Sequence, residues 1–273
     1  MLFNEAFELE RLPMNSAWAR ELCEHGIRKH YIKSLVELDV TLGRKAIRIY
    51  RASTGKDLSF FSWIVKCIAD TIDQHKTVHA LRYHRNEILI FNDVDISVPI
   101  EREVNGKRMP MPYVIRRANR KQLHEIHQEI DNAKNRPLSK DEQVLSKPIS
   151  ALLLKTFPSL PAFIRNAFWR RFDKNPFFQK RIMGTVGITS VAIAGNMTAW
   201  AVPISIQPVC FALGSVIRKS IIVEGRPEVR DYLALTAMFD HDVIDGAPAA
   251  RFISLLSKNI QHAYGLRTIE CAK

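Results

Sequence analysis

The chain has 273 residues, of which 47% are hydrophobic, so its composition excludes a disordered or fibrous protein and allows a sizeable core. Lysine and arginine (40) outnumber aspartate and glutamate (28), and the net charge of +12 suits an anionic partner such as a phosphorylated cofactor, an anionic lipid or an acidic protein. Four cysteines without a CxxC pair argue against a zinc ribbon and indicate a reducing cytoplasm. The first residues, MLFNEAFELERL, lack the basic and apolar regions of a signal peptide.

The first half of the chain mixes helical and extended patterns. Helical spacing and capping residues predict four helices, over residues 16–30, 41–53, 58–75 and 120–134. Extended patterns predict four strands, over residues 34–40, 87–91, 94–101 and 113–119. Asn92 and Asp93 fall between the second and third of these strands and predict the turn of a hairpin.

In the second half, residues 186–217 contain no charged side chain. Their length alone would allow a membrane span, but glycine, proline, Asn196 and Gln207 interrupt the run and β-branched residues dominate it. Buried strands near 186–192 and 209–217 fit better. Residues 218–241 predict two strands around Glu224-Gly225, and residues 246–265 predict a closing helix. We therefore expect one α/β domain over residues 1–273.

The octapeptide FDHDVIDG, residues 239–246, follows a predicted strand and precedes the closing helix. His241 can face a cleft there while its backbone is held, and imidazole is the side chain best suited to remove a proton near neutral pH. Asp245 and Gly246 would shape the turn. On the pattern alone a second interpretation stays open, in which Asp245 caps the helix and His241 is an ordinary polar residue.

Two further patterns contain candidate functional groups. Thr189 and Ser190 fall in an apolar strand pattern, where a hydroxyl aimed into a site can stabilise an oxyanion. The alternative is a threonine of high strand propensity followed by a turn serine. His124 and His127 are three residues apart, whereas the zincin pattern needs four, so we expect a solvated helix face and no metal site.

Residues 161–181 interleave six aromatic and six basic side chains around a single acid, Asp173. Three interpretations stay open. The segment lies on an anionic membrane surface, it docks an acidic carrier protein or the phosphates of a cofactor, or it packs its aromatic side chains on the core and exposes its charges. No nucleic-acid-binding motif accompanies it, so we expect no nucleic-acid partner.

Six segments, taken together, occur in an order typical of one family. They read SLVELDVT, LSFFSWIVKCIADTI, DVDISVPI, YVIRRANRKQLHEI, QPVCFALGSV and LALTAMFDHDVIDGAPAARFISLL. Over residues 16–265 the chain resembles the catalytic core of the dihydrolipoyl acyltransferases of 2-oxoacid dehydrogenase complexes, and it is more distantly similar to chloramphenicol acetyltransferase. The resemblance implies a chloramphenicol acetyltransferase-like α/β (α+β) fold, a mixed β-sheet flanked by helices. It also implies a homotrimer with its active sites between subunits.

The same resemblance implies roles for individual residues. His241 matches the general base that deprotonates a thiol or hydroxyl for attack on a thioester. Asp245 matches an aspartate that maintains the geometry of the site through an arginine, for which Arg20 lies in the right region. Thr189 matches the hydroxyl that bonds the oxyanion, with Ser190 kept as the alternative.

The chain departs from this family at three points. Asp242 stands where the complex-bound enzymes usually have arginine, no lipoyl domain precedes the core, and residues 146–180 form a longer insertion. We therefore expect a cytoplasmic, stand-alone acyltransferase, with acyl-CoA as donor, a hydroxyl, amine or thiol as acceptor, and no metal. Two alternatives stay open. One is a detached core served by a lipoyl or acyl carrier protein in trans, and the other is a non-catalytic trimeric scaffold or adaptor on an anionic membrane surface, held through residues 161–181.

Overall fold

The computed structural model of the chain describes residue 8 and residues 16–104, 107–135, 157–191 and 197–266. In this part of the chain the main sheet has six strands in the order β1-β8-β7-β6-β4-β5. The strands are β1 (Tyr31–Asp39), β4 (Ile96–Val104), β5 (Lys107–Ile115), β6 (Val186–Ser190), β7 (Val209–Val223) and β8 (Arg226–Asp240). Strand β6 is parallel to both of its neighbours, and the other pairs are antiparallel, so the sheet is mixed as expected.

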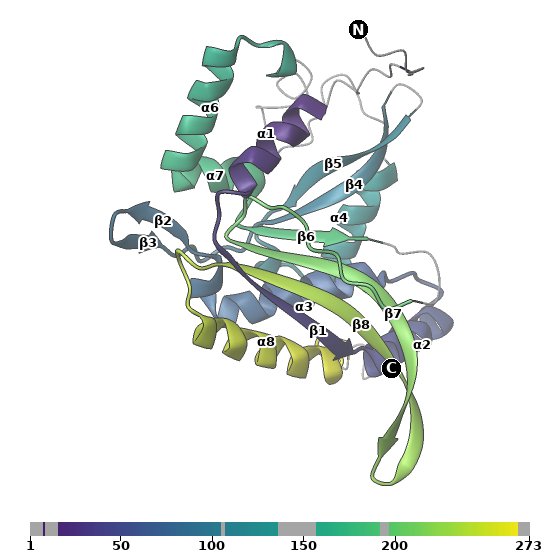
Figure 1. Ribbon diagram of the computed structural model, residues 1–273. Helices are drawn as coiled ribbons and strands as arrows, with labels where there is room; N and C mark the ends of the chain where they lie inside the picture. Colours follow the sequence, from purple (N-terminus) through teal and green to yellow (C-terminus); the bar gives the residue numbers. More distant parts are fainter. Residues whose placement is uncertain (1–7, 9–15, 105–106, 136–156, 192–196, 267–273) are drawn as a thin grey trace, which may run out of the picture.

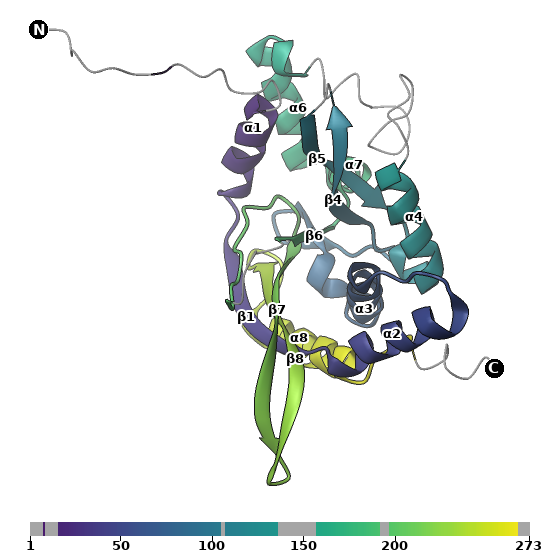
Figure 2. The same ribbon diagram turned by 90° about the vertical axis from the view of Figure 1, so that its right-hand side faces the viewer.

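Four helices cover one face of this sheet (Figures 1 and 2). They are α2 (Thr41–Thr54), α3 (Phe60–Gln74), α4 (Leu123–Asn135) and α8 (Gly246–Gln261). The main core lies between the two layers, where Phe211 of β7 and Phe239 of β8 meet Phe252 of α8, with ring centroids 5.7–6.3 Å apart. Burying each such side chain stabilises the fold by about 1.5–3 kcal/mol, so this contact fixes α8 on the sheet.

On the other face of the sheet, none of the described helices lies over β7 and β8, and residues 197–208 run across it (Figure 2). The backbone amide of Ala199 donates to the hydroxyl of Ser215, and the indole of Trp200 donates to the carbonyl of Val36. A Cβ at Gly214 would lie 2.2 Å from the carbonyl oxygen of Ala199. Only glycine therefore lets this segment lie directly against β7.

Three helices form a separate layer at one end of the sheet, namely α1 (Ser16–Gly26), α6 (Ala162–Lys174) and α7 (Pro176–Met183) (Figure 1). Trp169 of α6 is buried, stacks on the ring of His25 at 4.2 Å, and donates its indole N–H to Glu21 at 2.7 Å. Phe172 is buried in the same small core. Part of the aromatic set, Phe168, Trp169 and Phe172, thus packs in this small core. Phe163 and Phe177 are exposed, as are the basic residues Arg170, Arg171 and Lys174.

Most predicted elements are confirmed, with shifted ends, but one pairing is wrong. The segment 87–91 pairs with β2 (Leu81–His84), which the sequence did not reveal, and only residues Glu87–Leu89 form its strand, β3. Strand β4 pairs instead with β5. The polar residues taken for a hairpin turn are used elsewhere, because Asp93 accepts a hydrogen bond from Arg120.

The uncharged stretch forms β6 and the first part of β7, as expected. None of the described helices is both long and apolar enough to cross a membrane. The 3-10 turns η1 (Lys76–His79), η2 (Ala118–Arg120) and η3 (Phe157–Ser159) complete the described elements. Residues 146–156 of the insertion lie outside the described residues, and the single-domain organisation stays a prediction.

Candidate functional site

His241 is the first residue after β8, in the turn that leads to α8. Its backbone amide donates to the carbonyl of His30 at 2.7 Å, and the amides of Val243 and Ile244 donate to the carbonyl of Asp240. Ile244 is buried, which anchors the far side of the turn. The backbone of His241 is therefore held at both ends, while its side chain remains exposed to solvent.

Two acidic residues, Asp240 and Asp242, flank His241 in the chain and have different environments. Asp240 is buried, and its carboxylate accepts from the ammonium of Lys29 at 2.5 Å and from the amide of Asp242 at 3.2 Å. Asp242 is exposed and lies 3.1 Å from the ring nitrogen Nδ1 of His30. Asp242, which departs from the family pattern, thus has a partner in this chain. The sequence did not single out Lys29 or His30, which are 211 and 212 residues away from these partners.

Asp245 is the N-cap residue of α8 and has extended backbone angles. Its side chain makes no capping hydrogen bond and is exposed, so the structure does not use it as an ordinary cap. Arg20, the arginine suggested by the resemblance, is exposed on α1. Within the described part of one subunit, Arg20 and Asp245 form no ion pair with each other.

Thr189 and Ser190 are the last two residues of β6. Thr189 pairs with Ala212 of β7, next to Phe211, whose ring points to the helices. Because side chains alternate along a strand, Thr189 lies on the face of the sheet without helices. Thr189 is half-buried and Ser190 is exposed, so both hydroxyls can meet a ligand from outside the subunit.

The register of the sheet separates the two halves of the predicted site. Thr189 is opposite Ala212, which is opposite Thr236 of β8. His241 lies five residues beyond Thr236, which corresponds to about 16 Å along the strand direction, and two strand spacings add about 10 Å across it. Within one subunit, therefore, His241 and Thr189 are too far apart to act on one reacting carbon.

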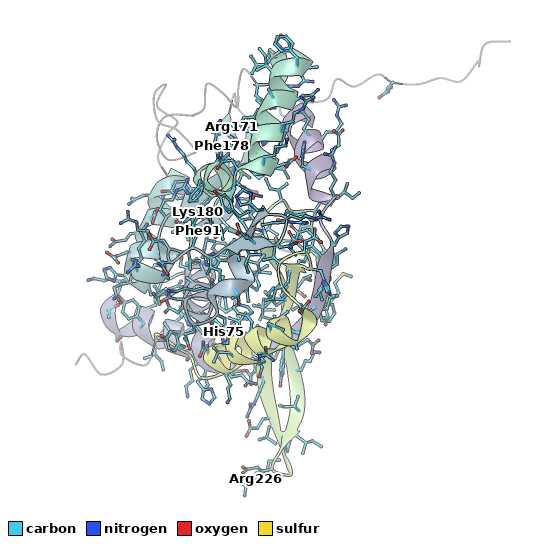
Figure 3. The ribbon with its side chains drawn as sticks, turned by 90° about the vertical axis from the view of Figure 1, so that its left-hand side faces the viewer. His75, Phe91, Arg171, Phe178, Lys180 and Arg226 are labelled. Atoms are coloured by element: carbon cyan, nitrogen blue, oxygen red, sulfur yellow. The ribbon has the colours of Figure 1, made fainter. Side chains whose placement is uncertain are left out.

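A buried ionic cluster fixes the beginning of β6. The carboxylate of Asp95 accepts from Lys180 at 2.6 Å and from Arg116 at 2.9 Å, and its backbone carbonyl accepts from the amides of Thr185 and Val186. Burial alone would raise the pKa of the Asp95 carboxyl, but Lys180 and Arg116 outweigh burial and hold that pKa below its ordinary value. Lys180 also lies over the ring of Phe91, at 5.2 Å (Figure 3). The strand that carries Thr189 is thus tied to β4 and α7.

A buried histidine, His79, contacts the segment that leads into β6. The ring of His79, in η1, lies 2.8 Å from the hydroxyl of Thr185 and 3.1 Å from the carbonyl of Phe91. Burial lowers the pKa of His79 to about 4, and the nearby charge of Lys180 adds to the effect. His79 is therefore neutral at physiological pH and serves as a hydrogen-bonding support for the segment that enters β6.

No group of three or more histidine, cysteine, aspartate or glutamate residues in the described ranges is arranged to hold a metal ion. His124 is exposed on α4, as expected for a solvated helix face, whereas His127 is half-buried and its Nδ1 is buried, so the expectation holds only at His124. One groove, with a volume of about 940 Å³, lies at the C-terminal end of α8, between Lys66, Asp70 and His262. None of the predicted site residues lines this groove.

Comparison with known proteins places these residues in a family. The sequence model of the 2-oxoacid dehydrogenases acyltransferase (catalytic domain) matches residues 15–143 and 181–266. These ranges include Thr189, His241 and Asp245, and they leave out residues 144–180. No curated protein matches the chain.

Solved structures with the same fold are catalytic cores of the same kind. A probable dihydrolipoamide acetyltransferase from Listeria monocytogenes is 17% identical, with a TM-score of 0.66 over 95% of this chain and 96% of that one. The dihydrolipoamide acetyltransferase of Azotobacter vinelandii is 18% identical, with a TM-score of 0.66 over 99% and 97%. The cubic core of a pyruvate dehydrogenase multienzyme complex is 16% identical, with a TM-score of 0.66 over 99% and 97%. The expected fold is confirmed.

Proposed function

The chain belongs to the 2-oxoacid dehydrogenase acyltransferase (catalytic domain) family and has an acyltransferase core, and we propose that it transfers an acyl group from acyl-CoA to a hydroxyl, amine or thiol acceptor in the cytoplasm. His241 is the general base, and Thr189 is the oxyanion donor, with Ser190 as its alternative. The observation that carries this proposal is the turn at His241. It fixes the backbone by a 2.7 Å hydrogen bond and leaves the imidazole exposed, within the part of the motif that the family model matches.

The proposed reaction needs one proton carrier and one hydroxyl. The imidazole of His241 takes the proton of the acceptor, whose sulfur, oxygen or nitrogen attacks the thioester carbonyl. The hydroxyl of Thr189 donates a hydrogen bond to the oxyanion of the tetrahedral intermediate. The intermediate collapses, the C–S bond breaks, and the leaving thiolate of CoA takes the proton back from the imidazolium. No atom changes its oxidation state, and the enzyme returns to its starting state.

This chemistry requires two subunits, because the register separates His241 from Thr189 in one subunit. We therefore propose a homotrimer in which each site takes His241 from one subunit and Thr189 from the next, as a cyclic arrangement permits. The helix-free face of the sheet supports this. Leu35, Met197 and Ile204 are 53%, 58% and 48% exposed there, which is apolar surface that a neighbouring subunit would cover. One similar structure is itself a cubic core, a higher assembly of such subunits.

The donor distinguishes the main proposal from its closest alternative. The net charge of +12 suits the phosphates of CoA. A lipoyl or acyl carrier protein acting in trans is the alternative donor, and family membership favours it. The two are separable with free dihydrolipoamide, because a detached core of a dehydrogenase complex would exchange acyl groups between dihydrolipoamide and CoA, in either direction, and an independent acyltransferase would not.

The exposed face of α6 supports a peripheral contact with an anionic membrane. Phe163 is 73% exposed, and Arg170, Arg171 and Lys174 are exposed further along the helix. Arg171 also lies 5.3 Å from the ring of Phe178 (Figure 3). Each cation near an anionic bilayer contributes about 1 kcal/mol to binding. Sedimentation with phosphatidylserine vesicles tests this contact. The wild-type protein is expected to bind the vesicles, and the Arg170→Ala/Lys174→Ala variant is expected to lose this binding. Vesicle binding without any thioester turnover would instead favour the non-catalytic adaptor.

The experiment that tests the proposed function follows release of free thiol from a panel of acyl-CoA donors with hydroxyl, amine and thiol acceptors. His241→Ala is expected to lower kcat by a factor of about 10³ or more, the loss typical of a positioned general base combined with its site. His124→Gln, which alters an exposed histidine on α4, is the matched control and leaves turnover unchanged. Full turnover by a folded His241→Ala variant would falsify the proposed mechanism.

A further inference from the structure

Two consecutive residues between α1 and β1 contact three consecutive residues of the catalytic turn. The ammonium of Lys29 donates to the carboxylate of Asp240, the carbonyl of His30 accepts from the amide of His241, and the ring of His30 lies 3.1 Å from the carboxylate of Asp242. We call residues 29–30 the 29–30 clip. It supplies the contacts that hold the backbone of His241 from outside its own turn.

Asp240 is the centre of this arrangement. Its side chain is 5% exposed, whereas that of Lys29 is 22% exposed. One carboxylate oxygen accepts from the Lys29 ammonium and the other accepts from the amide of Asp242, the residue directly after His241. The amide of Asp240 itself donates to the carbonyl of Pro208. The Asp240 carboxylate thus fixes the peptide bond between His241 and Asp242, and Lys29 fixes the carboxylate.

We propose that Lys29 is a positioning residue for His241, acting through the buried carboxylate of Asp240, and the proposal rests on the function proposed above. The amides of His241 and Asp242 flank the catalytic side chain, and both depend on the 29–30 clip. Removing the Lys29 charge leaves a buried carboxylate without its cation, so the turn rearranges to hydrate it. A displacement of about 1 Å at a catalytic group is enough to lower turnover by a factor of about 100.

The insertion, which the family model leaves out, supports the 29–30 clip through α1. The 29–30 clip follows directly after α1, and α1 is held by α6 through the Trp169–His25 stack and the Trp169–Glu21 hydrogen bond. The amide of Lys29 also donates to the carbonyl of Gly26, the last residue of α1. Lys29 is therefore placed by a rigid helix layer rather than by a free loop.

The test compares three variants with the wild-type protein as an assembled oligomer. Lys29→Met removes the cation, Lys29→Met/Asp240→Asn removes both charges and keeps an oxygen that accepts from the Asp242 amide, and Lys29→Arg keeps a cation. The exposed pair between Lys219 and Glu37 supplies the control, Glu37→Gln. The readouts are kcat and KM, and hydrogen exchange of the amides of residues 240–244 by mass spectrometry.

We expect kcat to fall 10- to 100-fold in Lys29→Met, with KM changed less than twofold, and the amides of His241 and Asp242 to exchange at least tenfold faster. The double variant leaves no unpaired buried charge, so it retains the fold if Lys29→Met alone does not. It also shows the loss of kcat, because the side chain at position 240 has lost the ammonium that fixes it against the Asp242 amide. Lys29→Arg restores at least half of the wild-type kcat, and Glu37→Gln changes neither readout.

The outcomes separate this proposal from the proposed function. Folded Lys29→Met or double variants with wild-type kcat and unchanged exchange would overturn the role of Lys29. If the wild-type protein itself shows no acyl transfer, the proposed function fails, and the role of Lys29 in catalysis fails with it. Hydrogen exchange then still shows whether the 29–30 clip holds the turn. A Lys29→Met variant that loses stability and kcat to the same extent, while the amides of residues 240–244 still exchange slowly, would also contradict the proposed role of Lys29 in positioning His241.

Discussion

Thr189 and His241 belong to the same sheet but are separated by two strand spacings and five register positions. A site that uses both must therefore be assembled from two subunits. Mixed oligomers of Thr189→Ala and His241→Ala subunits, each inactive alone, are expected to regain turnover. In a cyclic trimer that contains both kinds of subunit, one of the three sites receives both intact residues, so activity per site in the purified mixed oligomers returns to about one third of the wild-type value.

The measurement for this prediction uses two affinity tags to purify the mixed oligomers, followed by the free-thiol assay. Mixing two preparations of His241→Ala subunits with different tags is the control and stays inactive. If the mixed oligomers are as inactive as each parent, the site does not combine His241 and Thr189 from neighbouring subunits.

Asp245 is predicted to affect activity more than stability. Its side chain makes no capping hydrogen bond within the subunit, so Asp245→Asn leaves the free energy of unfolding within about 1 kcal/mol of wild type, the scale of a helix-dipole contribution. Turnover falls at least tenfold because the carboxylate shapes the site. Urea unfolding and the thiol assay on the same preparations check both parts. A loss of several kcal/mol with normal turnover would show that Asp245 is only a structural residue.

The lowered pKa of His79 is expected to make the stability of the fold depend on pH. Burial lowers its pKa to about 4 in the folded protein, whereas the unfolded chain has a histidine pKa of about 6.5. Between these values the unfolded state binds a proton that the folded state does not, so stability falls as the pH drops from 6.5 towards 4, by up to about 1.4 kcal/mol per pH unit. Above pH 6.5 this contribution is constant.

Unfolding midpoints at pH 7, 6 and 5 test this dependence. His79→Gln lowers stability at pH 7, because it disturbs the bonds to Thr185 and Phe91, and it flattens the profile between pH 7 and 5. His124→Gln, on the exposed face of α4, leaves the profile as in wild type. An unchanged slope in His79→Gln would assign the pH dependence to other groups.

Replacing Asp95 by asparagine is expected to cause a large loss of stability. Its carboxylate is buried between Lys180 and Arg116, and removing one member of such a cluster leaves uncompensated charges at a typical cost of about 3–5 kcal/mol. The folded pKa of Asp95 is below the ordinary value, so its contribution is present above about pH 4 and is lost as the pH falls below that. Denaturant unfolding of Asp95→Asn at pH 7 measures the loss. The exposed pair of Asp57 with Arg51 supplies a control, since Asp57→Asn should stay near wild type.

The turn that carries His241 was predictable because its information is local. FDHDVIDG combines the end of a strand, a turn and the start of a helix within eight residues, and the structure places His241 and Asp245 in that turn. The partners of the turn were not predictable, since Lys29 and His30 reach it only after the chain has formed the pairing of β1 with β8. Nothing in the residues RKH distinguishes them from an ordinary basic helix end.

Elements whose signals lie within a few neighbouring residues could be predicted from the sequence. The apolar stripe of α3 and the turn at Glu224-Gly225, where both residues have positive φ, are of this kind, because side-chain spacing and backbone preference act locally. Three relationships became visible only in the folded chain: β3 pairs with β2, Lys29 neutralises Asp240, and Thr189 lies far from His241. Those relationships depend on which strands pair and in which register, and residues distant in the chain settle that together.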